Sequence, residues 1–311
     1  MQTLASFLAP RRIHLNPAEE RLVEVAPGIK VRCWCHWQSA DREKALTVIV
    51  VHGLEGSSES QYMLGVARSG LAAGMNVVLM NQRNCGGMNH FAPTLYNSSL
   101  SADVAAVARH MVEHEGVSHF ALAGFSMGGN LVLKLAGEWG RNGPREFRAV
   151  AAVCPAMDLA ASADALHEPA NRLYEWYFLV QLFRRMREKA KFFPEAFDVS
   201  RLRGISSLRL FDDRVTAHYC GFTGADDYYA RAAAANVVGQ IAVPALVIHA
   251  KNDPFIRLMP ETRERILANP NITFIETDDG GHCAFMGAPD GNGYDGRWAE
   301  REVVEFLRRF A

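Results

Sequence analysis

The sequence predicts an α/β fold, with a mostly parallel central sheet, helices on both of its faces and a helical insertion. Three observations predict it. Short apolar runs alternate with amphipathic segments along most of the chain, the interval 157–242 breaks that alternation, and a Gly-x-Ser-x-Gly motif stands between an apolar run and an amphipathic segment. Alternating strands and helices build parallel sheets, because each crossover helix packs back on the sheet. We therefore expect a core formed by residues 1–156 and 243–311, with a helical cap at 157–242.

The predicted strands are continuous apolar runs, as is typical of strands buried on both faces. They cover residues 45–53, 75–83, 119–126, 147–155, 244–253 and 272–281. Helices are expected between and after them, at 60–73, 101–115, 127–140, 259–268 and 297–310. Residues 21–37 alternate between polar and apolar, which predicts a leading antiparallel hairpin that turns at "APGI".

The interval 157–242 contains no strand-like run. In its first half, apolar residues recur at helical spacing among charged ones, which predicts a long amphipathic helix; they are Leu173, Trp176, Tyr177, Val180 and Phe183. We expect Trp176, Tyr177 and Phe183 to shape an apolar substrate pocket. The same aromatic and basic helix is also compatible with a non-catalytic module that binds a lipid or a partner protein.

Composition excludes several classes of protein. The 311 residues include 33 basic and 34 acidic ones, so no basic face for nucleic acid is expected. No apolar run reaches the roughly 18 residues of a membrane-spanning helix, so at most weak contact with a membrane surface is expected. In the first 17 residues an apolar stretch precedes the arginines, the reverse of a secretory signal. The six cysteines lie mostly in apolar segments, which favours reduced thiols and a cytoplasmic location.

Ser126 is the candidate nucleophile. It stands in the motif Gly124-Phe-Ser-Met-Gly128, after a predicted buried strand and before a predicted amphipathic helix. This is the setting of a nucleophile elbow, a sharp turn that exposes a serine at the start of a helix. Because such a turn brings neighbouring backbone close, the positions two before and two after the serine have no room for a side chain. The alternative is a glycine-rich turn with an incidental serine.

A serine hydroxyl becomes a nucleophile when an imidazole takes its proton and a carboxylate orients that imidazole. Of the eleven histidines, only His282 follows the last two predicted strands, in a glycine-flanked loop. Asp253 directly follows the strand before it, so both residues belong to the carboxyl edge of the sheet. Asp158, Asp278 and Asp279 compete as the acid; the last two stand so close to His282 in sequence that they are better suited to shape its loop.

An oxyanion hole needs two backbone N–H donors. Met127, directly after the serine, is expected to supply one, and Leu54 the other, from the loop after the first long apolar run. Gly53 permits close approach of that loop. His52 in the same loop is interpreted as a structural residue.

These motifs together resemble the α/β-hydrolase superfamily, and in finer detail its YheT-like branch. The stretches that carry the resemblance run in order along the chain. They are "HGLEGSSES" at 52–60, "NQRNCGG" at 81–87, "GFSMGGN" at 124–130, "FDDRVTAHYCGFTGADDYY" at 211–229, "HAKNDPF" at 249–255 and "GGHCAF" at 280–285. The stretch at 211–229 is the most discriminating of them. Asn84 stands where this branch is expected to have glycine.

The resemblance implies an esterase or lipase-like enzyme that acts on small-molecule or lipid-like carboxylic esters, with neither cofactor nor metal. The triad it implies is Ser126, Asp253 and His282. An apolar cap pocket favours short- to medium-chain acyl esters. Transfer of the acyl group to an alcohol is an open alternative, because it shares the acyl-enzyme with hydrolysis.

Two short sequence motifs could instead indicate metal sites. His110, Glu113 and His114 spell H-x-x-E-H, a zinc-peptidase pattern. On a helical wheel, however, His110 and Glu113 point away from the apolar stripe and toward solvent. Cys33 and Cys35 fall on one face of an alternating strand, which favours packing in the core.

Overall fold

One sheet organises the part of the chain that the computed structural model describes, namely residues 3, 11, 13–15, 17–290 and 294–311. Its eight strands lie in the order β1-β2-β4-β3-β5-β6-β7-β8. Their bounds are β1 (Glu19–Ala26), β2 (Ile29–His36), β3 (Thr47–Val51), β4 (Asn76–Met80), β5 (Phe120–Phe125), β6 (Phe147–Val153), β7 (Ala245–Ala250) and β8 (Ile272–Thr277). The pairs β1–β2 and β2–β4 are antiparallel, and the other neighbours pair in parallel. The predicted sheet with its leading hairpin is confirmed. Most of the N-terminal stretch that was compared with a secretory signal lies outside the described residues.

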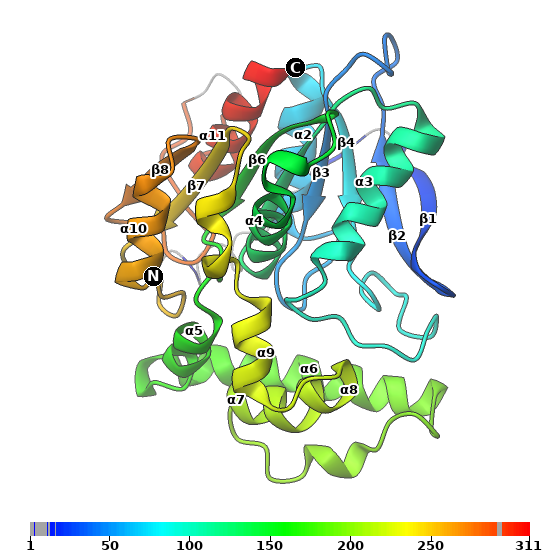
Figure 1. Ribbon diagram of the computed structural model, residues 1–311, viewed down its shortest axis with the longest axis vertical. Coiled ribbons are helices and arrows are strands. Elements are labelled where there is room, and N and C mark those ends of the chain that lie inside the picture. The colour runs from blue at the N-terminus through cyan, green and yellow to red at the C-terminus, as the bar shows by residue number, and fades with distance from the viewer. Residues whose placement is uncertain (1–2, 4–10, 12, 16, 291–293) are drawn as a thin grey trace.

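Helices cover both faces of the sheet (Figure 1). One face carries α3 (Ser101–Glu115), α4 (Met127–Trp139) and α10 (Pro260–Ala268), and the opposite face carries α2 (Gln61–Ala72) and α11 (Trp298–Leu307). Every residue of β3, β4 and β5 is buried, as their continuous apolar sequences predict. The carboxyl ends of these parallel strands lie at the same edge of the sheet, where the loops that follow them can bring side chains into one site.

Between β6 and β7 the chain is helical. It forms α5 (Leu159–Leu166), α6 (Arg172–Phe192), α7 (Leu208–Phe211), a π-helical turn (Asp212–Ala217), α8 (His218–Cys220) and α9 (Ala225–Ala232). These elements form a layer beyond one end of the sheet (Figure 1), and their hydrophobic cluster also includes Phe255 and Ile256 of the loop after β7. The division of the chain into a core and a cap domain at 157–242 stays a prediction.

The buried face of α6 is not the one predicted. The predicted stripe is largely exposed, with Leu173 and Trp176 each 62% accessible, whereas the opposite face is buried and includes Leu179, Leu182 and Met186. Both faces of α6 carry apolar residues at helical spacing, so periodicity alone does not show which face meets the cap interior. The buried face also contains two charged residues, Glu175 and Lys189.

The structure also bears on the predictions about membranes, cysteines and the two motifs with metal-binding patterns. Among the described residues, no helix combines the length and the apolar character needed to cross a membrane. All six cysteines are free thiols, and Cys33 and Cys35 are buried in the core of the sheet. Glu113 is exposed on α3, as the helical wheel predicts, whereas His110 is half-buried there.

Candidate active site

Ser126 occupies a strained turn between β5 and α4. Its φ of 54° and ψ of −119° lie in a region that side chains rarely adopt. A Cβ on Gly124 would come within 2.3 Å of the Gly128 carbonyl oxygen, and a Cβ on Gly128 within 2.2 Å of the Val51 carbonyl oxygen. The two glycines are therefore needed because backbone occupies the space on both sides. This geometry is that of a nucleophile elbow.

A chain of hydrogen bonds runs from the serine to a buried carboxylate. Nε2 of His282 lies 3.0 Å from Oγ of Ser126, and Nδ1 of His282 lies 2.8 Å from Oδ2 of Asp253. His282 stands in the loop after β8 and Asp253 in the loop after β7. Oδ1 of Asp253 accepts the backbone N–H groups of Phe255 (3.1 Å) and Ile256 (2.9 Å), which fix the carboxylate. Three residues distant in sequence thus meet at one edge of the sheet.

The histidine and the aspartate tune each other electrostatically. Burial lowers the pKa of His282, but the Asp253 carboxylate and its hydrogen bond outweigh burial and raise that pKa to about 10. Burial likewise raises the pKa of Asp253, yet the charge of His282 and the two backbone N–H donors hold it below its usual value. Since Asp253 stays ionised, it orients the Nδ1–H, so that in the neutral form of His282 the Nε2 lone pair points toward the serine hydroxyl.

The rival carboxylates have other partners. Asp158 accepts two hydrogen bonds from the start of α10. Asp278 and Asp279 pair with polar side chains of the loop after β7. Of the four candidates, Asp253 alone hydrogen-bonds His282.

Leu54 and Met127 border the same cavity as Ser126. Met127 is the first residue of α4, where backbone N–H groups have no intrahelical acceptor and favour negative charge. The Leu54 loop is held against the elbow, because the N–H of Gly53 donates to the Tyr62 hydroxyl at 3.0 Å and a Cβ on Gly53 would lie 3.1 Å from the Ser126 Cβ. Both positions suit donors to a tetrahedral oxyanion.

A family model described as the alpha/beta hydrolase fold matches residues 47–289, a span that holds the elbow, the aspartate and the histidine. The chain belongs to the α/β-hydrolase family.

The chain is similar to "Putative esterase YheT" of Escherichia coli, with 30% identity over 314 aligned positions that cover all of this chain and 90% of that protein. It is 29% identical to "Phospholipase ABHD3" of Mus musculus over 77% of this chain, and it spans only 58% of that longer protein. A solved esterase of Pyrococcus furiosus superposes with a TM-score of 0.60 over 96% of both chains, at 20% identity. That last likeness shows the fold alone.

In this α/β-hydrolase, one cavity lies between the elbow and the cap. Its space amounts to about 930 Å³, within the usual size range of ligand pockets. Most of its lining is apolar and comes from the cap and from the loop after β7, including Leu166, Leu182, Met186, Phe211, Phe255 and Ile256. Its polar lining residues include Asp212, which accepts hydrogen bonds from Thr216 and Tyr229.

A second cavity meets the first at Ser126. It is lined by His282, Cys283 and Tyr177, with Arg297 and Glu300 farther along. The serine therefore stands where two cavities join, and the second has more charged residues in its lining than the first.

Only one of the three aromatic residues expected at a substrate pocket reaches either cavity. Tyr177 lines the second cavity. Trp176 is on the exposed face of α6, and Phe183 stacks on Phe211 with ring centroids 6.2 Å apart. Trp176 therefore lies away from both cavities, whereas Phe183 packs inside the cap behind Phe211, which itself lines the first cavity.

His52 is a buried structural residue, as interpreted from the sequence. Its Nε2 accepts the backbone N–H of Gln82 at 3.1 Å, so Nδ1 carries the proton and donates to the Gly53 carbonyl at 2.8 Å. Burial lowers its pKa to about 4, which keeps the ring neutral.

Sequence reasoning missed a buried polar cluster beside the Leu54 loop. Glu55 pairs with Arg185 of α6, and Lys189 donates to the side-chain oxygen of Asn84 at 2.7 Å. Asn84 has a φ of 64°, which explains why a glycine-like position tolerates asparagine. The only signal in the sequence is that Arg185 and Lys189 share a helical face with the apolar Leu182.

Proposed function

We propose that this protein hydrolyses carboxylic esters through an acyl-enzyme formed on Ser126. The observation that carries the proposal is the hydrogen-bond chain from Ser126 through His282 to Asp253, with 3.0 and 2.8 Å between the bonded atoms. A nucleophile, a base and an orienting carboxylate in this order are the parts that acyl transfer requires. Similarity to proteins named as an esterase and a phospholipase supports the same reaction class.

In the first step, Oγ of Ser126 attacks the ester carbonyl carbon while Nε2 of His282 takes the hydroxyl proton. The imidazolium is stabilised by the Asp253 carboxylate, and the N–H groups of Leu54 and Met127 donate to the oxyanion. Collapse of the tetrahedral intermediate breaks the bond to the alcohol, which leaves with the proton from His282. In the second step His282 takes a proton from water while the water oxygen attacks the acyl carbon. The bond from the acyl carbon to Oγ of Ser126 then breaks, His282 returns the proton to Oγ, and the acid leaves.

The substrate we propose is an ester of a short- to medium-chain apolar acid. The apolar cavity beside Ser126 suits an acyl chain, since burial of each methylene contributes roughly 0.8 kcal/mol. The second cavity, which has more charged residues in its lining, then receives the alcohol portion and the attacking water. If an alcohol occupies that second cavity, the same acyl-enzyme supports transfer to the alcohol, which is the second candidate reaction.

Contact with a lipid surface is supported by the outer face of α6. This face exposes Leu173, Trp176, Tyr177 and Val180, and Tyr177 also lines the second cavity. Apolar and aromatic side chains beside basic ones are typical of helices that lie on a membrane surface. We propose that this face draws lipid-like esters toward the second cavity. Sedimentation with vesicles should therefore be weaker for a Trp176→Ser variant than for the parent.

The deciding experiment compares the parent with Ser126→Ala on p-nitrophenyl esters of increasing acyl length, with and without a competing alcohol. Ser126→Ala should lose about 10⁴-fold or more of turnover, whereas Ser39→Ala, a change at an exposed serine, should retain it. Formation of the new ester in the presence of alcohol would identify acyl transfer. Undiminished hydrolysis by Ser126→Ala would contradict the proposal.

A further inference from the structure

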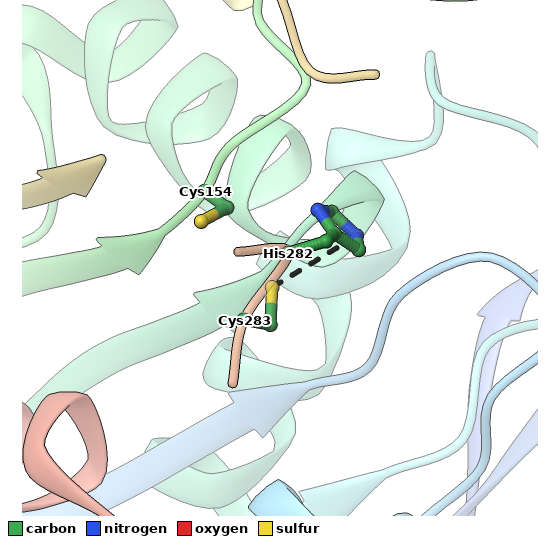
Figure 2. A group of neighbouring side chains, drawn as sticks. All are labelled: Cys154, His282 and Cys283. Carbon is green, nitrogen blue, oxygen red and sulfur yellow. Dashed lines mark hydrogen bonds between the residues drawn. The ribbon is translucent and has the colours of Figure 1, made fainter. Parts of the chain in front are cut away.

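We propose that Cys154, His282 and Cys283 form a binding site for a thiophilic divalent metal ion, such as zinc, and that the bound ion blocks the active site. One ligand atom from each residue, two Sγ and one imidazole nitrogen, lie within 4.8 Å of one another. Cys154 directly follows β6 and Cys283 directly follows His282, so two strand ends bring the side chains together (Figure 2). Neither cysteine has a part in the proposed acyl transfer.

The donor set matches the chemistry of zinc and related ions. Two thiolates and one imidazole are ligands that zinc and cadmium prefer, and a site with three protein ligands keeps a fourth position open. In a tetrahedral zinc–thiolate site the sulfur atoms stand about 3.8 Å apart, given zinc–sulfur bonds of about 2.3 Å. Because the three ligand atoms already lie within 4.8 Å of one another, metal binding needs only small movements of these side chains. Oγ of Ser126, 3.0 Å from Nε2 of His282, lies beside the open position.

His282 is already oriented as a metal ligand. Its Nδ1 faces the Asp253 carboxylate at 2.8 Å, and its Nε2 faces Cys283 Sγ at 3.9 Å. Metal-binding histidines commonly donate their second ring N–H to a carboxylate, which fixes the ring and directs the other lone pair to the ion. The hydrogen bond from Nδ1 to Asp253 thus stabilises a metal ion bound at Nε2, as it stabilises a proton bound there.

The second cavity provides access. Ser126, His282 and half-buried Cys283 line it, and buried Cys154 lies behind them. Each thiol has a weak sulfur hydrogen bond to a carbonyl, at 3.6 Å, and Cys283 Sγ also contacts Nε2 of His282 at 3.9 Å; metal binding replaces these contacts. Binding forms two metal–sulfur bonds and one metal–nitrogen bond, and the two thiol protons, together with the Nε2 proton of protonated His282, pass to water. No oxidant or reductant is needed, and the Nε2 lone pair is no longer available to accept the serine proton.

Metal binding is tested apart from activity, with full-length Ser126→Ala protein and cadmium as the probe. One equivalent of cadmium should produce the ultraviolet thiolate-to-cadmium absorption band. The band should disappear in Cys283→Ala, and in Cys154→Ser, which preserves the volume of the buried side chain. Cys220→Ala, which removes a thiol from the cap, is the matched control and should retain the band. A band of equal intensity in all three variants, or no saturable band in Ser126→Ala itself, would overturn the site.

The inhibitory effect rests on the proposed function and is tested with zinc on the parent enzyme. Zinc should inhibit ester hydrolysis, and a chelator should restore it. The half-inhibitory concentration, relative to each variant's own basal rate, should rise at least tenfold in Cys283→Ala and stay unchanged in Cys220→Ala. Equal inhibition of both variants contradicts the proposal, as does a loss of activity that requires peroxide and is reversed by dithiothreitol, which indicates a disulfide. A failure of the proposed function would leave the cadmium result intact, so the two failures are distinguishable.

Discussion

Arg185 of the cap helix α6 forms a two-pronged ion pair with Glu55, the residue directly after Leu54. Its Nε donates to Oε1 of Glu55 at 2.8 Å, and its Nη2 donates to Oε2 at 2.9 Å. Tyr96 completes the arrangement, because its hydroxyl donates to Oε1 at 2.7 Å and accepts the N–H of Glu55 at 3.0 Å. Glu55 has a φ of 55°, so these bonds hold a strained backbone. The cap and the loop that carries the Leu54 N–H are thereby fastened together.

Loss of this pair should slow turnover more than it weakens substrate binding. Arg185→Gln leaves the Glu55 carboxylate buried without its cation, and the loop relaxes away from the elbow. We expect kcat to fall by about 10- to 100-fold, with a smaller change in KM, because one misplaced oxyanion donor costs roughly 3 kcal/mol. Steady-state kinetics across the ester panel measure this split.

The matched control for this prediction is Arg184→Gln. Arg184 is the neighbouring residue on α6, and its side chain is 73% exposed in an ion pair with Glu188. Exposed pairs contribute little, so this variant should behave as the parent does. Arg185→Lys keeps the charge but loses the fork and should recover only part of the activity. Equal kinetics for Arg184→Gln and Arg185→Gln would refute a positioning role.

The fold and the residues around Ser126 could be predicted from the sequence because their constraints are local. A buried parallel strand reads as an apolar run, and the turn at Ser126 demands glycine at Gly124 and Gly128 whatever the rest of the chain does. Asp253 and His282 follow from the rule that loops at strand carboxyl ends meet at one edge.

The cap could not be predicted to the same depth. Apolar residues lie on two faces of α6, and the choice between them depends on packing against α5 and α7, which no pattern within α6 encodes. Burial of Arg185 and Lys189 has the same origin, since their partners Glu55 and Asn84 come from loops about 100 residues or more earlier in the chain. A charged residue on a helix usually faces solvent, whereas Arg185 and Lys189 form contacts between the cap and the core.

Asp253→Asn should shift the pH dependence of the reaction toward lower pH while lowering its maximum. General base catalysis needs neutral His282, whose fraction grows as the pH rises through its pKa. The Asp253 carboxylate raises that pKa to about 10, so its removal leaves burial, which lowers the pKa, as the dominant influence. The ascending limb of the kcat/KM profile therefore moves down in pH, and the plateau falls by about 10⁴-fold because the ring is misoriented.

An NMR titration of the imidazole nitrogens tests the same shift without relying on turnover. In a Ser126→Ala background, the pKa of His282 should be lower when residue 253 is asparagine than when it is aspartate. Asp278→Asn is the control, since Asp278 pairs with Lys251 on the surface and does not hydrogen-bond His282. An unchanged pKa in Asp253→Asn would show that the carboxylate does not control the base.

Gly128→Ala should abolish activity through the backbone alone. The added Cβ would stand 2.2 Å from the Val51 carbonyl oxygen and 2.5 Å from that of His52, and both belong to backbone that has no free space to move into. Overpacking of this kind costs about 3 kcal/mol, so the melting temperature should fall along with kcat. Gly239→Ala is the control, because its nearest neighbour would be a side-chain atom of Arg265 at 4.0 Å. Parent-like melting and activity for Gly128→Ala would exclude the close approach described for the elbow.

Substitutions at Met186 should change the preferred acyl length in opposite directions. Met186 lies on the buried face of α6 and lines the apolar cavity next to Ser126. Met186→Phe shortens the space for the acyl chain and should reduce kcat/KM for the longest esters by 10-fold or more relative to acetate, since one methylene in an apolar pocket is worth about 1–3 kcal/mol. Met186→Ala should move the optimum to longer chains. Val180→Phe makes a similar change on the exposed face of the same helix and should leave the profile unchanged. A shift produced by Val180→Phe, with none from Met186, would mean that the other face of α6 meets the substrate.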